Sequence, residues 1–249
     1  MKKTKQFIIS LNRADNVITA KWNKLATIVV REDQEKEYKK HNENKILAIP
    51  MEEDGNASKK RNAILKRFQN ENIVILDDDI KRVGYHEKGR MKGVDDLYFQ
   101  EFCDNMFEMA KDLETILWGV NVQTDKKFYR EYSPFSLSSI VLGPLMGIIN
   151  KDRSIRFNEK DLFLKEDYDL SLQVISKYRK ILRNNKWFYE SEHIELSGGL
   201  SGLRTNNLEK EHALRFQKKW GSRIVKINRK TQNQNKTINP IVKVPIKGI

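Results

Sequence analysis

The feature that most constrains the fold of this chain is an apolar, largely β-branched run over residues 73–76, followed by Asp77, Asp78 and Asp79. Such a run is typical of a strand buried in a parallel sheet, and open α/β sheets bind their ligands just beyond the carboxyl ends of these strands. Like charges concentrated there need a compensating cation, and a divalent metal ion that holds a substrate diphosphate supplies one. The alternative is a solvated acidic turn, because Asp-x-Asp is short and recurs in phosphatases, polymerases and nucleases.

The segments before this run alternate between strand-like and helical patterns. Residues 26–30 and 46–49 are apolar and predict two earlier strands, each followed by a polar or helical segment. A helix is predicted between the second strand and the acidic run, with Asn56 as its N-cap. This order predicts an α/β fold in which helices flank a mostly parallel central sheet. We expect one such domain over residues 1–225 and a basic C-terminal extension over residues 226–249.

Periodicity and capping residues predict the remaining elements. Residues 81–94 contain three glycines and predict a mobile loop over the acidic run. The later elements are expected to be a helix from Asp95 or Asp96 to Leu113, a strand over 116–122, a β-rich segment over 136–149, a helix over 167–182, a strand over 186–190, a glycine loop over 197–202 and a helix over 205–220.

The charge of the chain favours a polyanionic partner. The formal net charge is +13 and the pI is near 9.6. Residues 213–249 contain no Asp or Glu but many Lys and Arg, so this segment either is simply solvated or neutralises nucleic-acid phosphates. The single cysteine, Cys103, excludes disulfides and Cys-based zinc sites within the monomer. No apolar stretch in the sequence is long enough to span a bilayer, so we expect no membrane partner.

A second acidic cluster lies at the start of the helix predicted over residues 167–182. Glu166, Asp167 and Asp169 either cap this helix or provide a general base that takes a proton from an attacking hydroxyl. Asp167 is the first candidate for this base, and Glu166 is the second. Arg61, near the start of the earlier helix, is placed to pair with the acidic run or with a phosphate, or is a surface side chain.

One histidine and two glycines are further candidates for the site. The His193 imidazole would complete a manganese shell formed by Asp-x-Asp carboxylate and diphosphate oxygens, although a lone histidine more often has a structural role. The backbone N–H groups of Gly198 and Gly199 would approach a phosphate or a sugar, unless these glycines form a plain turn.

Taken in order, four motifs resemble those of a GT-A glycosyltransferase, a Rossmann-like fold: residues 27–31, the pair Arg61-Asn62, the acidic run 77–79 and residues 166–169. The resemblance extends from about residue 25 to residue 225. More narrowly, the Leu-Lys-Glu-Asp-Tyr-Asp-Leu peptide and the basic C-terminus are similar to the TET-associated glycosyltransferases of bacteriophages. That family is associated with the transfer of sugars onto hydroxymethylated pyrimidines in DNA.

The resemblance implies a donor site at the acidic run. The first predicted strand, the loop that follows it and Arg31, directly after the strand, would hold the base and ribose of the nucleotide. Arg61 and Asp78 would contribute to nucleotide binding. Asp77 would face the ribose or the metal, and Asp79 would ligate the Mn²⁺ or Mg²⁺ that bridges the diphosphate.

The resemblance also implies an acceptor site. Glu166 and Asp167 match the position of the catalytic base in inverting members, and His193 is similar in placement to a C-terminal metal ligand. Whether the enzyme inverts or retains the anomeric configuration stays open. A modified base in DNA would be flipped out of a duplex or read in a single strand, and stacking surfaces would come from exposed aromatic side chains among Trp118, Trp187, Phe188 and Tyr189.

The expected function is therefore metal-dependent transfer of a sugar from a nucleotide sugar, with a UDP-sugar as the expected donor, onto hydroxymethylated pyrimidines in DNA. No signal peptide and no obligate protein partner are inferred, and the expected location is the cytoplasm, that of the host if a phage encodes the chain. Three alternatives remain: a GT-A enzyme acting on a glycan, lipid or protein, a magnesium-dependent nuclease or phosphotransferase using Asp77, Asp79 and Glu166, and a non-enzymatic nucleic-acid-binding protein.

Overall fold

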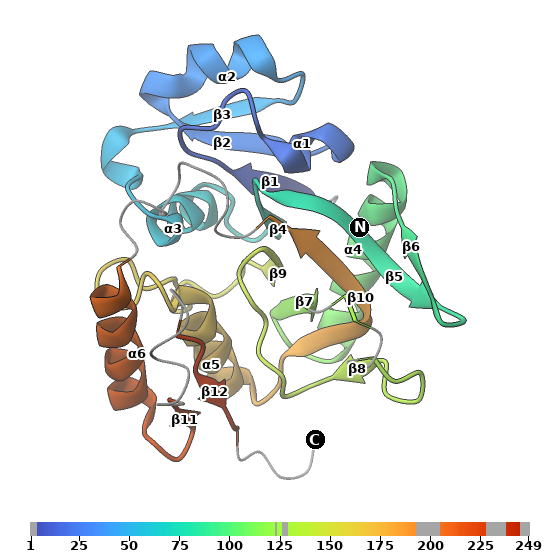
Figure 1. Cartoon of the computed structure of the whole chain (residues 1–249), viewed down its shortest axis with the longest axis vertical. Helices are drawn as coiled ribbons and strands as arrows, with labels where there is room; N and C mark the ends of the chain where they lie inside the picture. Colours follow the sequence, from blue (N-terminus) through green and yellow to red (C-terminus); the bar gives the residue numbers. More distant parts are fainter. Residues whose placement is uncertain (1–3, 123, 126–128, 193–204, 228–237, 245–249) are drawn as a thin grey trace.

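The computed structural model describes residues 4–122, 124–125, 129–192, 205–227 and 238–244, and its central feature is one large sheet flanked by helices (Figure 1). The strands of this sheet are β1 (Lys5–Ile9), β2 (Thr27–Arg31), β3 (Ile46–Ile49), β4 (Asn72–Asp77), β5 (Ile80–Glu87), β6 (Arg90–Gly93), β7 (Leu117–Asn121), β8 (Phe135–Ser136), β9 (Leu145–Ile149) and β10 (Leu182–Ser191). The helices are α1 (Ile18–Trp22), α2 (Glu35–His41), α3 (Ala57–Arg67), α4 (Asp96–Asp112), α5 (Glu166–Tyr178) and α6 (Asn206–Trp220), with 3₁₀ turns at Glu32–Gln34 and Met51–Glu53.

The sheet is mostly parallel, as the sequence predicts. Its order is β3-β2-β1-β4-β9-β7-β10-β5-β6, and β8 pairs with β10. The first four strands along this order are mutually parallel, and β7 and β10 run in the same direction as they do. β9 lies antiparallel between β4 and β7, and β5 is antiparallel to β10. The α/β fold with a mostly parallel central sheet is therefore confirmed.

The buried strand before the acidic run is β4, and it lies near the middle of the sheet. Its residues from Ile73 to Leu76 are fully buried. The parallel neighbour β1 pairs Ile9 with Asp77, so the chain that leaves β1 at Ser10 lies beside the acidic run. β1 was not predicted from the sequence, because its first residues are polar and only three apolar residues follow them.

The loop predicted over residues 81–94 is wrong, because this segment is the β5–β6 hairpin. Its two-residue turn, Lys88-Gly89, has positive φ angles of 48° and 73°, which are the angles of a type I′ turn. Lysine is uncommon at this position, where Asn or Asp is usual, so the turn was hard to identify. Gly84 does not mark a loop either: a Cβ there would overlap the Lys92 carbonyl oxygen, so glycine permits close strand packing.

The predicted helices are present, with one wrong boundary. The Asn56 side chain caps α3 by accepting a hydrogen bond from the Lys59 N–H at 2.9 Å, and Asp95 caps α4 in the same way. The helix predicted to reach residue 182 ends at Tyr178, because Arg179 adopts a left-handed conformation with φ 66°. The residues that follow it join β10 instead.

The end of the described chain packs back on the domain. β12 (Ile241–Val242) pairs antiparallel with β11 (Val225–Lys226), and Ile238 is buried. A second apolar cluster joins α5 to α6 and β11, through Tyr168, Phe216 and Val225 among others. In the parts of the chain that the structure describes, no helix is long and apolar enough to cross a membrane.

Candidate active site

Two acidic clusters that are far apart in the sequence meet on one arginine. Arg61, near the start of α3, is 2% exposed and donates from Nη2 to Asp77 Oδ1 at 2.8 Å and from Nη1 to Glu166 Oε1 at 2.7 Å. Its Nη2 also donates to the Gly143 carbonyl at 3.2 Å. The pairing of Arg61 with the acidic run was one of the alternatives open from the sequence. The pairing with Glu166 brings the predicted metal motif and the predicted base to the same place.

The acidic run, residues 77–79, forms a turn, which we call the acidic turn. Its backbone is hydrogen-bonded by a threonine that could not be singled out from the sequence. Thr19 in α1 is fully buried, and its Oγ1 donates to the Asp77 carbonyl at 2.6 Å. The same hydroxyl accepts from the Ile80 N–H at 2.9 Å, and the Thr19 N–H donates to the Asp78 carbonyl at 3.1 Å. Because these bonds bracket the turn on both sides, they fix the backbone that presents the three carboxylates. No motif in the sequence marks Thr19 for this role.

Asp78 is engaged by the segment after β1. Its Oδ2 accepts from Ser10 Oγ at 2.6 Å, and its Oδ1 accepts from Arg13 Nη1 at 2.6 Å. Burial raises the pKa of the Asp78 carboxyl, and the Arg13 guanidinium opposes that rise. Asp78 therefore ties β1 to β4 at the edge of the site, and its predicted role in nucleotide binding remains a prediction.

Asp79 is the carboxylate whose ionisation is most clearly perturbed in this turn. It is 8% exposed, and its pKa is raised to about 7, chiefly by burial and then by the charges of Asp77 and Asp78. A nearby divalent cation would reverse this cost, because opposite charge favours the ionised form. The oxygen donors present here are those that Mg²⁺ and Mn²⁺ prefer.

The donor set fits a metal that a substrate also ligates. Among the described residues, no group of three or more His, Cys, Asp or Glu side chains is arranged to hold a metal ion. Mg²⁺ at phosphate sites is commonly held by one or two carboxylates together with substrate phosphates, and Asp79 with Asp77 matches that pattern. The predicted ligand His193 lies outside the described residues, as do Gly198 and Gly199.

The three carboxylates of the second acidic cluster, at the start of α5, make different contacts. Glu166 is buried against Arg61, and its pKa is raised to about 7, first by burial and then by the charge of Asp167. Asp167 is half-buried, and its Oδ2 accepts from the Gly143 N–H at 2.8 Å. Asp169 is fully buried and accepts from Trp220 Nε1 at 2.7 Å and from Lys219, so it ties α5 to α6.

Gly143 allows this close arrangement. An added Cβ there would lie 3.2 Å from both Asp167 Oδ2 and Arg61 Nη2, which is tighter than ordinary van der Waals contact. The glycine backbone therefore contacts both groups at once: its carbonyl accepts from Arg61 and its N–H donates to Asp167. Gly143 lies within the segment predicted as β-rich over residues 136–149, and nothing in the sequence marks it for this role.

The structure places the other candidate side chains away from these contacts. Arg31, at the end of β2, pairs with Asp33 through bonds of 2.6 and 2.7 Å rather than with the acidic turn. A cation that was not predicted, Lys60, is buried and pairs with Asp54 at 3.1 Å. It also donates to the carbonyl of Ser10, whose hydroxyl donates to Asp78. The four aromatic residues proposed for base stacking, Trp118, Trp187, Phe188 and Tyr189, are all buried. They belong to the core and offer no stacking surface.

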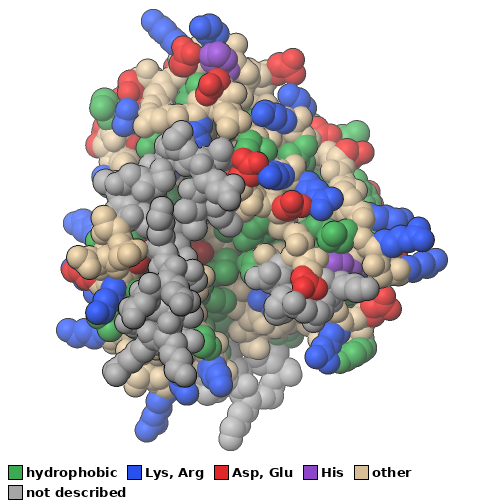
Figure 2. Space-filling model, viewed as in Figure 1, with side chains coloured by type: hydrophobic (Ala, Val, Ile, Leu, Met, Phe, Trp, Pro, Cys, Tyr) green, Lys and Arg blue, Asp and Glu red, His purple; other side chains and the backbone are tan. Residues whose placement is uncertain are grey.

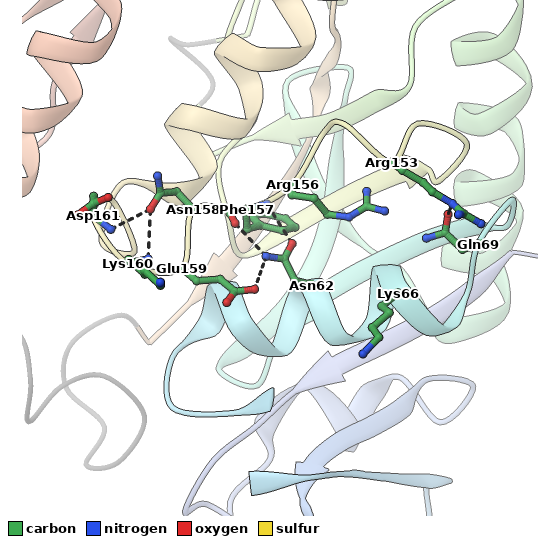
Figure 3. Close-up of a pocket in the computed structure, with 10 residues that line it drawn as sticks. All are labelled: Asn62, Lys66, Gln69, Arg153, Arg156, Phe157, Asn158, Glu159, Lys160 and Asp161. Carbon is green, nitrogen blue, oxygen red and sulfur yellow. Dashed lines mark hydrogen bonds between the residues drawn. The ribbon is translucent and has the colours of Figure 1, made fainter. Parts of the chain in front are cut away.

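An open groove of about 730 Å³ lies beside α3 (Figure 3). Its lining residues include none of the carboxylates of the two acidic clusters. Asn62 links its two walls by donating to the Phe157 carbonyl at 2.9 Å and to Glu159 Oε1 at 2.8 Å. Phe157 also lies 5.4 Å from the Arg61 guanidinium, so one side chain separates the groove from the acidic site. The lining residues are Asn62, Lys66, Gln69, Arg153, Arg156, Phe157, Asn158, Glu159, Lys160 and Asp161.

Comparison with known proteins shows a family and a fold. The family model described as TET-Associated Glycosyltransferase matches residues 4–199. The fold is similar to that of the mannosyltransferase PcManGT from Pyrobaculum calidifontis, solved with GDP-Man and Mn²⁺, with a TM-score of 0.55 and 11% identity over 87% of this chain. It is also similar to glucosyl-3-phosphoglycerate synthase from Mycobacterium tuberculosis, solved with Mn²⁺, UDP-glucose and phosphoglyceric acid, with a TM-score of 0.52, 8% identity and coverage of 98% of this chain and 88% of that one.

These likenesses at low identity show the GT-A fold. The chain spans 64% of the mannosyltransferase, and 65% of S. aureus TarS 1-349, a further match whose TM-score is 0.49. No curated protein matches the chain.

Proposed function

Because the chain belongs to the TET-associated glycosyltransferase family, we propose that it transfers a sugar from a nucleoside diphosphate sugar onto a hydroxymethyl group of a pyrimidine base in DNA. It is a glycosyltransferase of the GT-A type. The family match leaves no reason to retain the nuclease or the non-enzymatic alternative. The observation that carries the proposal is the Arg61 bridge, which joins Asp77 of the acidic turn to Glu166 beside Asp167.

The donor would bind at the acidic turn. Asp79 and Asp77 would hold a Mn²⁺ or Mg²⁺ ion, which when bound stabilises the negative charge of the departing diphosphate. The buried Asp79, with its raised pKa, supports this role because a bound cation would offset the cost of ionising it. The two structural relatives were solved with Mn²⁺ and with GDP-Man or UDP-glucose, and we propose a UDP-sugar as the donor to test first.

The acceptor would be activated at the start of α5. Asp167 would take the proton of the acceptor hydroxyl, because it is more exposed than Glu166 and the Gly143 N–H fixes its orientation. Glu166 is the second candidate: its pKa of about 7 suits a general base, but its carboxylate is already bonded to Arg61. Arg61 would then hold the carboxylates of Glu166 and Asp77 in position and would not itself react.

A DNA acceptor is supported by charge and by the family. The net charge of +13 attracts a polyanion, and residues 213–249 carry Lys and Arg without any Asp or Glu. Transfer to a glycan, lipid or protein would use the same catalytic carboxylates and remains the competing function. Only the acceptor distinguishes the two.

Mass spectrometry of the acceptor tests this proposal. The protein is incubated with Mn²⁺, a panel of nucleotide sugars and DNA that contains either 5-hydroxymethylpyrimidines or the unmodified bases. We expect the mass of one sugar to be added to the hydroxymethylated nucleosides only, since the unmodified bases lack the hydroxyl group. Transfer to a glycan or protein hydroxyl with no transfer to any DNA would contradict the DNA acceptor and leave the glycosyltransferase assignment standing.

A further inference from the structure

We propose that the β5–β6 hairpin binds the phosphate backbone of the acceptor DNA where the DNA approaches the acidic turn. This inference rests on the proposed function and adds to it where the acceptor lies. The hairpin begins directly at the acidic turn: Asp79 precedes Ile80, the first residue of β5. Strand β10 fixes this end of the hairpin beside the site, because β10 pairs with β5 and the Glu192 N–H donates to the Asp79 carbonyl at 3.1 Å. A DNA strand bound along the hairpin would therefore reach the acidic turn at the base of the hairpin.

The hairpin is strongly basic. Between Ile80 and Gly93 it carries five cationic side chains and one acidic one. The cations near its base are compensated: Lys81 pairs with Glu192 at 2.8 Å and Arg82 with Glu190 at 2.7 Å.

The uncompensated charge is at the turn. Lys92 pairs with Glu87 within the hairpin, whereas Lys88 and Arg90 form no ion pair with any of the residues that the structure describes. Both are exposed, and every residue of β6 is exposed. Figure 2 shows Lys and Arg side chains gathered at the right-hand edge of the molecule, where Figure 1 places this turn. Phosphates are the natural counter-charge for such a group, because binding them releases condensed counterions.

Two tyrosines accompany these cations and favour a nucleic acid over another polyanion. Tyr85 pairs in register with Lys92, so their side chains share a face of the hairpin. Tyr98 is 43% exposed, and its ring lies 5.9 Å from that of Tyr85. The centre of the Trp187 ring lies 5.2 Å from that of the Tyr85 ring, and this packing supports the two tyrosines. Aromatic faces beside Lys and Arg are the usual platform on which bases stack.

The length of the hairpin determines the footprint, which is the number of nucleotides between the modified base and the far end of the bound DNA backbone. β5 has eight residues, which at about 3.3 Å per residue place the turn roughly 25 Å from Asp79. Successive phosphates along one DNA strand are about 3.4 Å apart along the helix axis. The turn would therefore contact the backbone about seven nucleotides from the base that is modified, on one side only.

The test removes the two uncompensated charges. The variant Lys88→Asn/Arg90→Gln keeps the turn, because asparagine is well suited to the positive φ of a type I′ turn. The matched control is Lys36→Gln/Lys40→Gln, which removes two exposed charges from α2, at the opposite edge of the sheet beyond β3. Binding to hydroxymethylated DNA is measured between 50 and 200 mM salt.

We expect the log–log salt slope to fall by about 1.8 in the hairpin variant, at about 0.9 for each phosphate that the variant no longer neutralises, and to stay unchanged in the control. Wild type would then lose roughly tenfold more affinity across this salt range than the hairpin variant loses. Stabilisation by UDP with Mn²⁺ should be the same in all three proteins, since neither pair lies in the donor site. A hairpin variant that retains the wild-type slope would overturn the proposal.

A series of oligonucleotides checks the footprint. Wild type should bind more weakly when fewer than about seven nucleotides remain on one side of the target base, and the hairpin variant should not respond to that shortening. Equal length dependence in both proteins would refute the hairpin as the docking surface, even if DNA is the acceptor. Wild-type protein that neither binds nor modifies DNA would instead contradict the proposed function itself.

Discussion

Replacing Asp79 with asparagine should raise the unfolding free energy of the metal-free protein. The same substitution should weaken the stabilisation of the protein by Mn²⁺ and UDP. The carboxyl is 8% exposed and close to Asp77 and Asp78, so ionising it in the folded protein is costly. Asp79→Asn keeps the shape of the side chain and removes that cost. It also removes the negative oxygen that we propose as the metal ligand.

The size of the first effect follows from the pKa. The pKa of Asp79 is about 7 in the folded protein and 3.8 for an ordinary Asp, and each tenfold change in an acid constant corresponds to about 1.4 kcal/mol. Because the folded protein holds this proton more tightly, wild-type stability falls as the pH rises from about 4 to about 7. The advantage of Asp79→Asn should be well under about 1 kcal/mol at pH 4 and should grow to a few kcal/mol at pH 8.

Denaturant unfolding in a chelator measures this difference at pH 4, 6 and 8 for both proteins. Thermal unfolding at pH 8 is then repeated with Mn²⁺ and UDP. We expect the ligands to stabilise wild type by mass action and to stabilise Asp79→Asn much less. If the difference in unfolding free energy stays constant with pH, the raised pKa of Asp79 is refuted. Equal ligand stabilisation of both proteins would refute its role in the donor site.

Three further substitutions test the rest of the site. Asp167→Asn should abolish sugar transfer and leave the thermal shift with Mn²⁺ and UDP nearly intact, because a general base acts on the acceptor; equal losses in both assays would make Glu166 the base. Arg61→Ala should lower the unfolding free energy by about 3–5 kcal/mol at pH 8, since it leaves Glu166 buried and Asp77 half-buried without their partner, and an unchanged denaturation midpoint would show that the bridge does not form. Thr19→Ala should cost about 1–3 kcal/mol and weaken Mn²⁺-dependent binding of UDP, whereas Thr19→Ser should retain both, and an alanine variant that binds like wild type would rule out support of the turn.

The parts of the fold that local pattern determines could be predicted from the sequence. The buried strand β4, the capped helices α3 and α4 and the acidic cluster at the start of α5 all depend on neighbouring residues. β1 could not be found this way, since only its position between β2 and β4 makes it a central strand. The β5–β6 hairpin was misread because its glycines suggested a loop and its turn begins with lysine.

The candidate site was predictable in its residues more than in its connections. The acidic run, Arg61 and the Glu166-Asp167 pair each stand out as charge at the end of an element. Their meeting depends on contacts across 105 residues of sequence, between Arg61 and Glu166, which no local pattern encodes. The same is true of Thr19, whose hydroxyl supports the acidic turn from a helix that starts near residue 18.

The central claim is that the two acidic clusters joined by Arg61 form one site, with the donor at Asp79 and the acceptor at Asp167. A crystal structure of the protein with UDP and Mn²⁺ measures this most directly. The claim predicts a metal ion bound to Asp79 and to the diphosphate, with Asp167 facing the side where the sugar would be attached. A nucleotide bound elsewhere, such as in the groove lined by Lys66 and Arg156, with no metal at Asp79, would contradict it.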